Sequence, residues 1–225
     1  MKNTTSSSLP PPSRRRQNLA LLVEATATAN DGHDVLTQLL AFSGSQASAE
    51  ALLRFFPSVG HVLAAEPAQL ADFGISSHDL ALFRLVRHAA SRLALAEFRS
   101  RPILTNWQAL IEYLQSSMAY EQVEQLRILF LDRKNILISD EVQQGGTVDH
   151  TPVYPREVVK RALILNASAI ILVHNHPSGD PSPSRDDIEM TNQIKLAAHA
   201  IGLVLHDHLI IGHGRHSSLR ALGLL

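Results

Sequence analysis

The stretch Ala169-Ile170-Ile171-Leu172-Val173-His174-Asn175-His176 carries most of the information about the fold. Its first five residues are apolar and largely β-branched, which is typical of a buried strand. Because side chains alternate along a strand, His174 and His176 point to the same side of the backbone. Pro177 then ends the strand pairing. We therefore predict a buried strand over residues 169–174 that delivers two imidazoles to one place.

The chain after these histidines first turns and then becomes helical. Residues 178–183 are dense in Pro, Gly, Ser and Asp, which indicates a turn. A helical pattern opens at Ser184, and the turn can carry Asp187 back toward the histidines. Two histidines and an aspartate would leave a fourth tetrahedral position open for water, as catalytic zinc sites do. The pattern predicts a centre for metal-activated hydrolysis.

Ser184 and Asp187 also have an interpretation that needs no metal. A serine followed three residues later by an acidic residue is typical of a capping box at a helix start. His-x-His alone is a weak signal in a chain with 12 histidines. The joint pattern of His-x-His, seven residues, Ser, two residues and Asp is far more specific. The two roles are compatible, because Ser184 can cap the helix while Asp187 faces the ion.

This spacing resembles the JAMM (MPN+) metalloprotease motif, and His-Asn-His-Pro-Ser-Gly-Asp-Pro is similar to RadC-type proteins, the UPF0758 group. The likeness runs from about Arg101 to Leu225. Further matching segments are Leu129 to Asn135, Gly146-Thr147, Pro155 to Val159, Leu205 to Gly212 and Ser217-Ser218.

The resemblance implies roles at matching positions. The implied ligands of one zinc ion per chain are His174, His176 and Asp187. A glutamate before the first strand of the domain would take a proton from water and return it to the leaving amine. Glu124 is the predicted base, because the RadC-type pattern carries an acid there, and Glu121 is the alternative. Ser184 would donate a hydrogen bond to the developing oxyanion.

His206-Asp207-His208 is a second histidine cluster. It falls between the apolar runs 203–205 and 209–211, which we predict to be two short strands. We expect Asp207 and His208 either to have a structural role or to orient the metal ligands through hydrogen bonds. His206, His213 and His216 are expected at the surface.

Composition is that of a protein with real cores and no thiol chemistry. At 225 residues and 45% hydrophobic content the chain can hold one large or two modest domains. Zero cysteines exclude disulfides and thiolate ligands, so zinc would be held by nitrogen and oxygen. A net charge of −1 gives no long-range pull toward nucleic acid or anionic membranes. With no secretory h-region or membrane-length apolar run, we expect a cytoplasmic protein without a membrane partner.

The chain divides into three parts by pattern. Residues 1–20, which include Arg14-Arg15-Arg16, are polar and rich in Pro and Ser, so we predict a disordered tail. Residues 21–100 show helical spacing throughout and predict a small all-α domain. From residue 101 helices and strands interleave, which predicts an α/β (α+β) sandwich with a mixed sheet, of the JAMM/MPN type. Its expected helices cover 107–118, 155–165 and 184–201, and its expected strands include 126–131 and 136–142.

The helical domain has a family interpretation of its own. RadC-type proteins usually carry a helix-hairpin-helix there, whose two glycines let backbone amides approach DNA phosphates. Leu70, Phe73, Gly74 and Ile75 resemble its first half, but Ser76 stands where the second glycine belongs, and Ser77-His78-Asp79 supplies an acid instead of a base. We predict a degenerate hairpin in which a helical docking role is favoured over DNA binding.

Three functions compete. The first is a zinc-dependent peptidase or isopeptidase acting on an unknown protein or conjugate. The second is a DNA-repair-associated accessory protein, and the third is a non-catalytic metal-binding interaction module. The full ligand set and the glutamate favour the first. The sequence names no substrate, oligomeric state or native metal.

Overall fold

A computed structural model describes residues 32–99, 101–143 and 154–225. The predicted tail over residues 1–20, with its three arginines, and Gly146-Thr147 lie outside this part of the chain. Within the described part, no helix combines the length and the apolar character needed to cross a membrane. The described part of the chain divides into two compact units, with the division between Phe83 and Arg84.

The first unit is helical over its described residues, 32–83, as predicted. Its helices are α2 (Gly32–Ser43), α3 (Ala49–Phe55), α4 (Val59–Ala64), α5 (Pro67–Leu70) and the start of α6 (Ser77–Phe98), with a 3-10 turn over Ala71–Phe73. Buried apolar residues from every helix form one core, namely Leu36, Leu40, Ala49, Leu52, Phe56, Val62, Leu70 and Phe83. The division between units falls inside α6, between Phe83 and Arg84, whereas the predicted junction at residues 100 and 101 lies just past the end of this helix.

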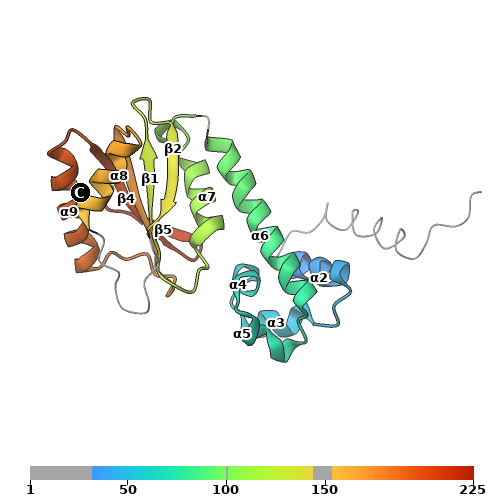
Figure 1. The fold of residues 1–225 in the computed structure, drawn as a ribbon. Helices are drawn as coiled ribbons and strands as arrows, with labels where there is room; N and C mark the ends of the chain where they lie inside the picture. Colours follow the sequence, from blue (N-terminus) through green and yellow to red (C-terminus); the bar gives the residue numbers. More distant parts are fainter. Residues whose placement is uncertain (1–31, 100, 144–153) are drawn as a thin grey trace, which may run out of the picture. The chain divides into compact units, whose positions relative to one another are not determined.

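The second unit is built on a five-stranded mixed sheet (Figure 1). Its strands are β1 (Leu126–Leu131), β2 (Leu137–Val142), β3 (Ala169–Asn175), β4 (Val204–Gly212) and β5 (Arg215–Ser218), in the order β2-β1-β3-β4-β5. Only β3 and β4 pair in parallel. Strand β3, which contains the strand predicted over residues 169–174, is therefore the central strand of the sheet. All of its residues are buried. This explains its unbroken apolar run.

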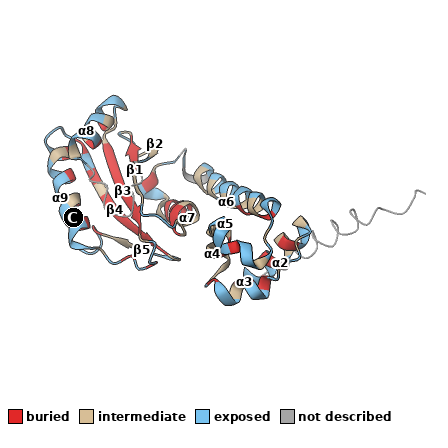
Figure 2. Ribbon diagram, turned by 60° about the horizontal axis from the view of Figure 1, so that its bottom comes forward, coloured by how far each residue is buried: buried red, intermediate tan, exposed pale blue. Residues whose placement is uncertain are grey.

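Helices cover both faces of the sheet. On one face α7 (Trp107–Met118) packs on Leu129, Ile171 and Leu209. On the other face α8 (Pro155–Ile164) and α9 (Arg185–His199) pack on Ile128, Ile170 and Leu205. Figure 1 shows α7 on one side of the sheet and the α8–α9 pair on the other, and Figure 2 shows that burial concentrates along β1, β3 and β4. The predicted α+β sandwich with a mixed sheet is confirmed.

The sequence prediction of two short strands near residues 203 and 209 is wrong, because β4 is one strand with a bulge. Its pairing with β3 slips between Ile170 and Ile171, which face Leu205 and Asp207, so His206 is the extra residue. The bulge switches the strand's faces: Leu205 packs toward α8 and α9, whereas Leu209 packs toward α7. As a consequence, the side chain of His208 reaches the α9 face.

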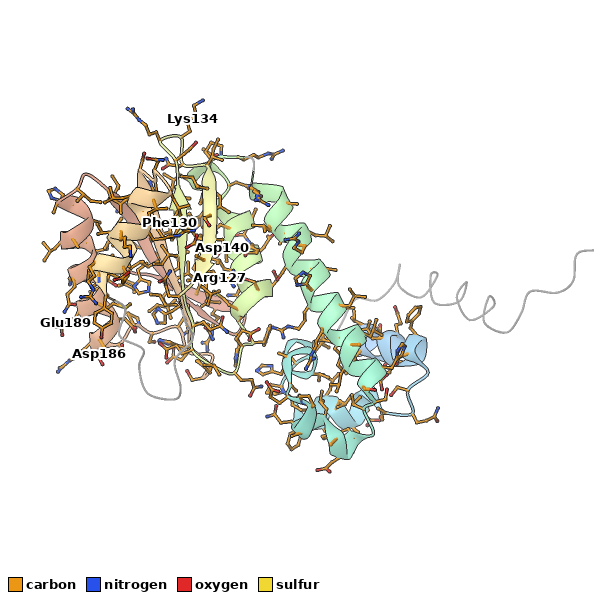
Figure 3. All side chains as sticks on the ribbon, in the orientation of Figure 1. Arg127, Phe130, Lys134, Asp140, Asp186 and Glu189 are labelled. Carbon is orange, nitrogen blue, oxygen red and sulfur yellow. The ribbon has the colours of Figure 1, made fainter. Side chains whose placement is uncertain are left out.

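Ion pairs fasten the edge strand β2 on both faces. Arg127 of β1 and Asp140 of β2 form a 2.9 Å pair in which each side chain is 11% exposed, and the Tyr113 hydroxyl contacts both (Figure 3). On the opposite face Arg161 of α8 binds Glu141 of β2 at 2.6 Å. The edge strand is thus anchored to both helical layers.

Candidate metal centre

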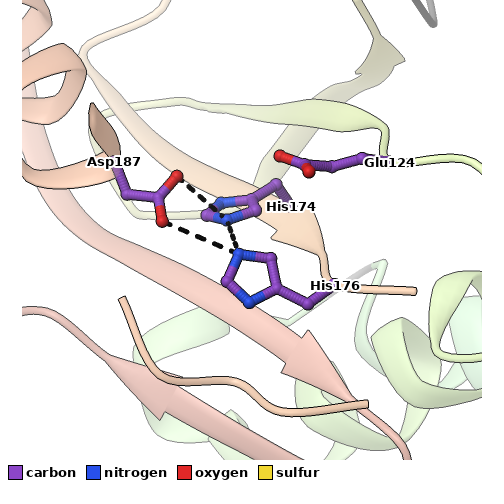
Figure 4. A group of neighbouring side chains, drawn as sticks. All are labelled: Glu124, His174, His176 and Asp187. Atoms are coloured by element: carbon purple, nitrogen blue, oxygen red, sulfur yellow. Dashed lines mark hydrogen bonds and ion pairs between the residues drawn. The ribbon is translucent and has the colours of Figure 1, made fainter. Parts of the chain in front are cut away.

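Four side chains from three separate segments meet at the carboxyl end of β3 (Figure 4). His174 is on the strand, His176 follows it, Asp187 is in the first turn of α9, and Glu124 precedes β1. One ligand atom from each of the four lies within 4.8 Å of those of the others. The structure thus brings together the three sequence-predicted ligands and the predicted base.

A buried hydrogen-bond chain fixes the protonation of His174. The Thr191 hydroxyl lies 2.5 Å from the Asp187 carbonyl oxygen, and because a carbonyl only accepts, Thr191 donates there. The same hydroxyl oxygen lies 2.5 Å from His208 Nδ1, so it accepts the Nδ1 proton. Burial lowers the pKa of His208 well below its ordinary value, so its ring is neutral and Nε2 carries no proton.

It follows that His208 Nε2 accepts the proton on His174 Nδ1, 2.8 Å away. His174 therefore carries a proton on Nδ1, and its Nε2 faces the other members of the group. A histidine that donates its other ring nitrogen in this way is oriented as a metal ligand. Both His208 and Thr191 are fully buried, so water does not compete for the chain.

His176 is fixed in the same tautomer by a different partner. Its Nδ1 lies 2.7 Å from the Asp180 carbonyl oxygen, which can only accept, so the proton is on Nδ1. The facing Asp187 carboxylate raises the pKa of His176, against the effect of partial burial. The peptide N–H of His176 donates to the Ile211 carbonyl oxygen at 2.9 Å and so extends the pairing with β4.

The loop that supplies Asp180 is held by close packing. Gly179 has a φ of +80°, and any Cβ there would collide with the His213 imidazole. That ring stacks on Tyr120, with ring centroids 5.4 Å apart. His213, which we expected at the surface, is half-buried because the loop packs against it. His216 is exposed as predicted, and His206 is half-buried and donates to Asn135 Oδ1 at 2.7 Å.

Ser184 and Asp187 form the capping box that the sequence suggested. The Ser184 N–H and hydroxyl donate to Asp187 Oδ2 at 2.7 and 2.6 Å, and the Asp187 N–H donates back to the hydroxyl oxygen at 3.1 Å. The other oxygen, Oδ1, lies 3.2 Å from His174 Nε2. Burial opposes ionisation of Asp187, but His174, His176 and Ser184 outweigh it and hold the pKa of this carboxyl far below its ordinary range.

These contacts gather nitrogen and oxygen atoms that could hold a cation. His174 Nε2 and His176 Nε2 lie 2.9 Å apart, and each faces an oxygen of Asp187, at 3.2 and 3.6 Å. The raised pKa of His176 favours a proton in this space in the metal-free protein. A divalent ion held by His174, His176 and Asp187 would take the place of that proton, and nitrogen and oxygen donors of this kind suit it.

The two candidate bases have different surroundings. Glu124 is exposed and belongs to the group of four. The carboxylate of Glu121 lies 2.6 Å from an Arg87 guanidinium nitrogen of α6. This ion pair engages Glu121 with α6 rather than with the histidines.

Asp207 and His208 have separate structural roles. The Asp207 carboxylate accepts from the backbone N–H groups of His208 and Arg220 and from the Ser218 hydroxyl, so it fastens the C-terminal segment to β4. His208 contacts His174 directly. Thr191 was missed by the sequence reasoning, although it lies four residues after Asp187 and therefore on the same helix face.

The turn before α6 in the first unit holds a carboxylate of its own. Gly74, in this turn, has a left-handed φ of +73°. The Ser76 N–H and hydroxyl donate to Asp79 Oδ2 at 2.8 and 2.7 Å, and Asp79 is buried. The Asp79 carboxylate thus already accepts the hydrogen bond of the Ser76 N–H. In the RadC-type pattern, the second glycine of the hairpin would stand at this position.

The mixed sheet between α7 and the α8–α9 pair, with two histidines, an aspartate and a glutamate at the end of its central strand, defines a JAB/MPN-type α+β domain. The model of the family described as RadC-like JAB domain matches residues 104–224. The chain belongs to this RadC family, the UPF0758 group.

Curated relatives agree with this assignment. A UPF0758 protein of Rhodobacter capsulatus is 60% identical over 178 residues, which cover 79% of this chain and 83% of the relative. A UPF0758 protein of Ruegeria pomeroyi is 51% identical over 178 residues, covering 79% and 80%. Neither name states an activity.

Proposed function

We propose that this protein is a zinc-dependent metallohydrolase that cleaves amide bonds of the peptide or isopeptide type. The observation that carries the proposal is the pair of Nε2 atoms facing the Asp187 carboxylate, with Glu124 beside them. Membership of a JAB-domain family is compatible with it. The partner we propose is a protein or conjugate substrate.

His174 Nε2, His176 Nε2 and Asp187 would hold the ion. Zinc suits two imidazoles and one carboxylate, and when bound it would activate water and polarise a carbonyl. The hydrogen-bond chain from Thr191 through His208 holds the His174 ring, and the Asp180 carbonyl oxygen holds the His176 ring. Both rings are thus held with Nε2 toward the place of the ion. The capping box holds Asp187.

Glu124 would accept the proton from water and deliver it to the leaving amine. Its exposure lets a substrate reach it from solvent. Ser184 would donate to the oxyanion, for which its hydroxyl must turn away from Asp187 Oδ2. A cation held by Asp187 would favour that rotation, because it would weaken the competing acceptor.

DNA binding by the first unit is the alternative that the structure favours less. The Asp79 carboxylate already accepts the hydrogen bond of the Ser76 N–H, and its negative charge would repel a phosphate at this place. We therefore assign the first unit a docking role in this proposal.

Metal content measured by mass spectrometry tests the centre. Wild type should carry about one zinc per chain, and His176→Ala and Asp187→Ala should carry almost none, since each removes a ligand. Wild type that stays metal-free after zinc reconstitution would overturn the proposal.

A matched pair of variants tests the chemistry on amide and isopeptide substrates. Glu124→Gln should keep its zinc and lose about 100- to 10,000-fold in rate, as expected for a general base. Glu121→Gln should stay near the wild-type rate. The opposite result would move the base to Glu121.

A further inference from the structure

Asn175, between the two histidines, has its side chain on the opposite face of β3. Its neighbours of the same parity, Ile171 and Val173, pack toward α7. Asn175 is completely buried at the end of the strand. A buried amide at this place needs partners for one acceptor and two donors.

All three partners come from the segment over residues 121–125. Asn175 Oδ1 accepts from the Gln125 N–H at 2.9 Å. Its Nδ2 donates to the carbonyl oxygens of Glu121 at 3.3 Å and Val123 at 3.2 Å. The contacts thus bracket Glu124 on both sides.

Besides these bonds, the Glu121 N–H donates to the Met118 carbonyl oxygen at 3.2 Å, which holds the start of the segment. Val123 and Glu124 are exposed, and residues 121–125 belong to neither a helix nor a strand. The ion pair of Glu121 with Arg87 ties the segment to α6, but both side chains are partly exposed, at 32% and 25%. Partly exposed ion pairs stabilise little. The buried amide is the stronger fastening, because leaving its partners unpaired is costly.

We propose that Asn175 is the positioning residue for Glu124. The same strand end then carries the metal-binding imidazoles on one face and, through Asn175, sets the place of the base on the other. The role of Glu124 rests on the proposed function. The attachment of the segment to Asn175 rests only on these hydrogen bonds.

Asn175→Asp is the informative variant, since it keeps the shape and the acceptor but loses both donors. Val173→Ala is its control, because it loosens the same face of β3 without touching the segment. Amide hydrogen exchange should rise about 10- to 100-fold in the peptide containing Gln125 for Asn175→Asp. It should stay near wild type there for Val173→Ala, and zinc content should be unchanged in both.

The link to the base is tested by cobalt substitution. The visible spectrum of the cobalt-loaded protein is followed against pH for wild type, Glu124→Gln, Asn175→Asp and the double variant. Asn175→Asp should shift the midpoint in the same direction as Glu124→Gln, and the double variant should show no further shift.

Each contrary outcome has its own meaning. Unchanged exchange in Asn175→Asp overturns the inference. Raised exchange with a wild-type midpoint, or additive shifts in the double variant, reduces Asn175 to a structural residue and also overturns it. Wild type that binds neither metal removes the proposed function, and the base role with it, whereas the exchange result still reports whether Asn175 fastens the segment.

Discussion

Helices α6 and α9 begin with the same four-residue arrangement, Ser-x-x-Asp. In both, the serine N–H and hydroxyl donate to the Oδ2 atom of the aspartate, at 2.8 and 2.7 Å in Ser76–Asp79 and 2.7 and 2.6 Å in Ser184–Asp187. Each aspartate N–H returns a bond to the serine oxygen. The local sequence therefore makes nearly the same cap twice.

The two caps differ in the surroundings of the second carboxylate oxygen, Oδ1. Asp79 Oδ1 is buried and has no hydrogen-bond partner within the described residues. Asp187 Oδ1 faces His174, because β3 ends opposite the start of α9. A capping box thus places a carboxylate, and the neighbouring element decides whether it becomes a ligand.

The largest expected difference between the caps is in metal binding. Asp187→Asn should lower zinc affinity by more than about 100-fold, since even the partners behind ligands contribute 10- to 100-fold. Asp79→Asn should leave the affinity unchanged. Competition with a chromophoric chelator measures both, and equal losses in the two variants would break the comparison.

The hydrogen-bond chain from Thr191 through His208 to His174, here called the relay, has no counterpart at Asp79. Substitutions of Thr191 test it. Thr191→Val should weaken zinc binding about 10- to 100-fold, because His208 then loses the partner that sets its tautomer. Thr191→Ser keeps the hydroxyl and should restore the affinity. Nitrogen-15 NMR of the imidazoles should show His174 protonated on Nδ1 in the metal-free wild type; protonation on Nε2 would refute the relay.

Removal of the capping hydroxyls should have a smaller effect, on stability. In metal-free protein Ser76→Ala and Ser184→Ala should each cost about 1 kcal/mol, the usual value for an N-cap. Native-state hydrogen exchange separates the units, so each loss should be confined to the unit that carries the substitution. A loss in the other unit would mean that the caps are not local devices.

The smallest effect should be the acid response of the first unit. Burial opposes ionisation of Asp79, but hydrogen bonds from serine hydroxyls and from the Ser76 N–H hold its pKa below the ordinary 3.8. A lowered pKa contributes stability above pH 3.8 that is lost as the pH falls through the lowered value. Urea unfolding at pH 5 and at lower pH should show this loss in wild type and a shallower one in Asp79→Asn.

The sequence predicted what depends on local pattern. The periodicities located β1, β3, α7 and α9 to within two residues at either end, and the box at Ser184 was recognised. Strand β5, with the polar sequence Arg-His-Ser-Ser, has no apolar pattern to reveal it. The bulge at His206 was missed for a similar reason, because one extra polar residue leaves no periodic trace.

Features that depend on distant segments were beyond the sequence. Asn175 meets Gln125 across 50 positions, and no spacing rule relates them. His208 was chosen for a supporting part from its neighbourhood, but its contact with His174 depends on the bulge. Thr191 was within reach, because its spacing from Asp187 places both on one helix face.

The bulge also determines which helical layer each later residue of β4 faces. Leu205 and Leu209 are both odd-numbered, yet they face opposite layers because His206 intervenes. If β4 instead paired with β3 by regular alternation, with no extra residue after Leu205, every later side chain of the strand would exchange faces. His208 would then turn away from His174 with no ligand altered. The contact between His208 and His174 therefore depends on the shift in pairing at His206, so a substitution at position 206 that keeps the bulge should leave this contact intact.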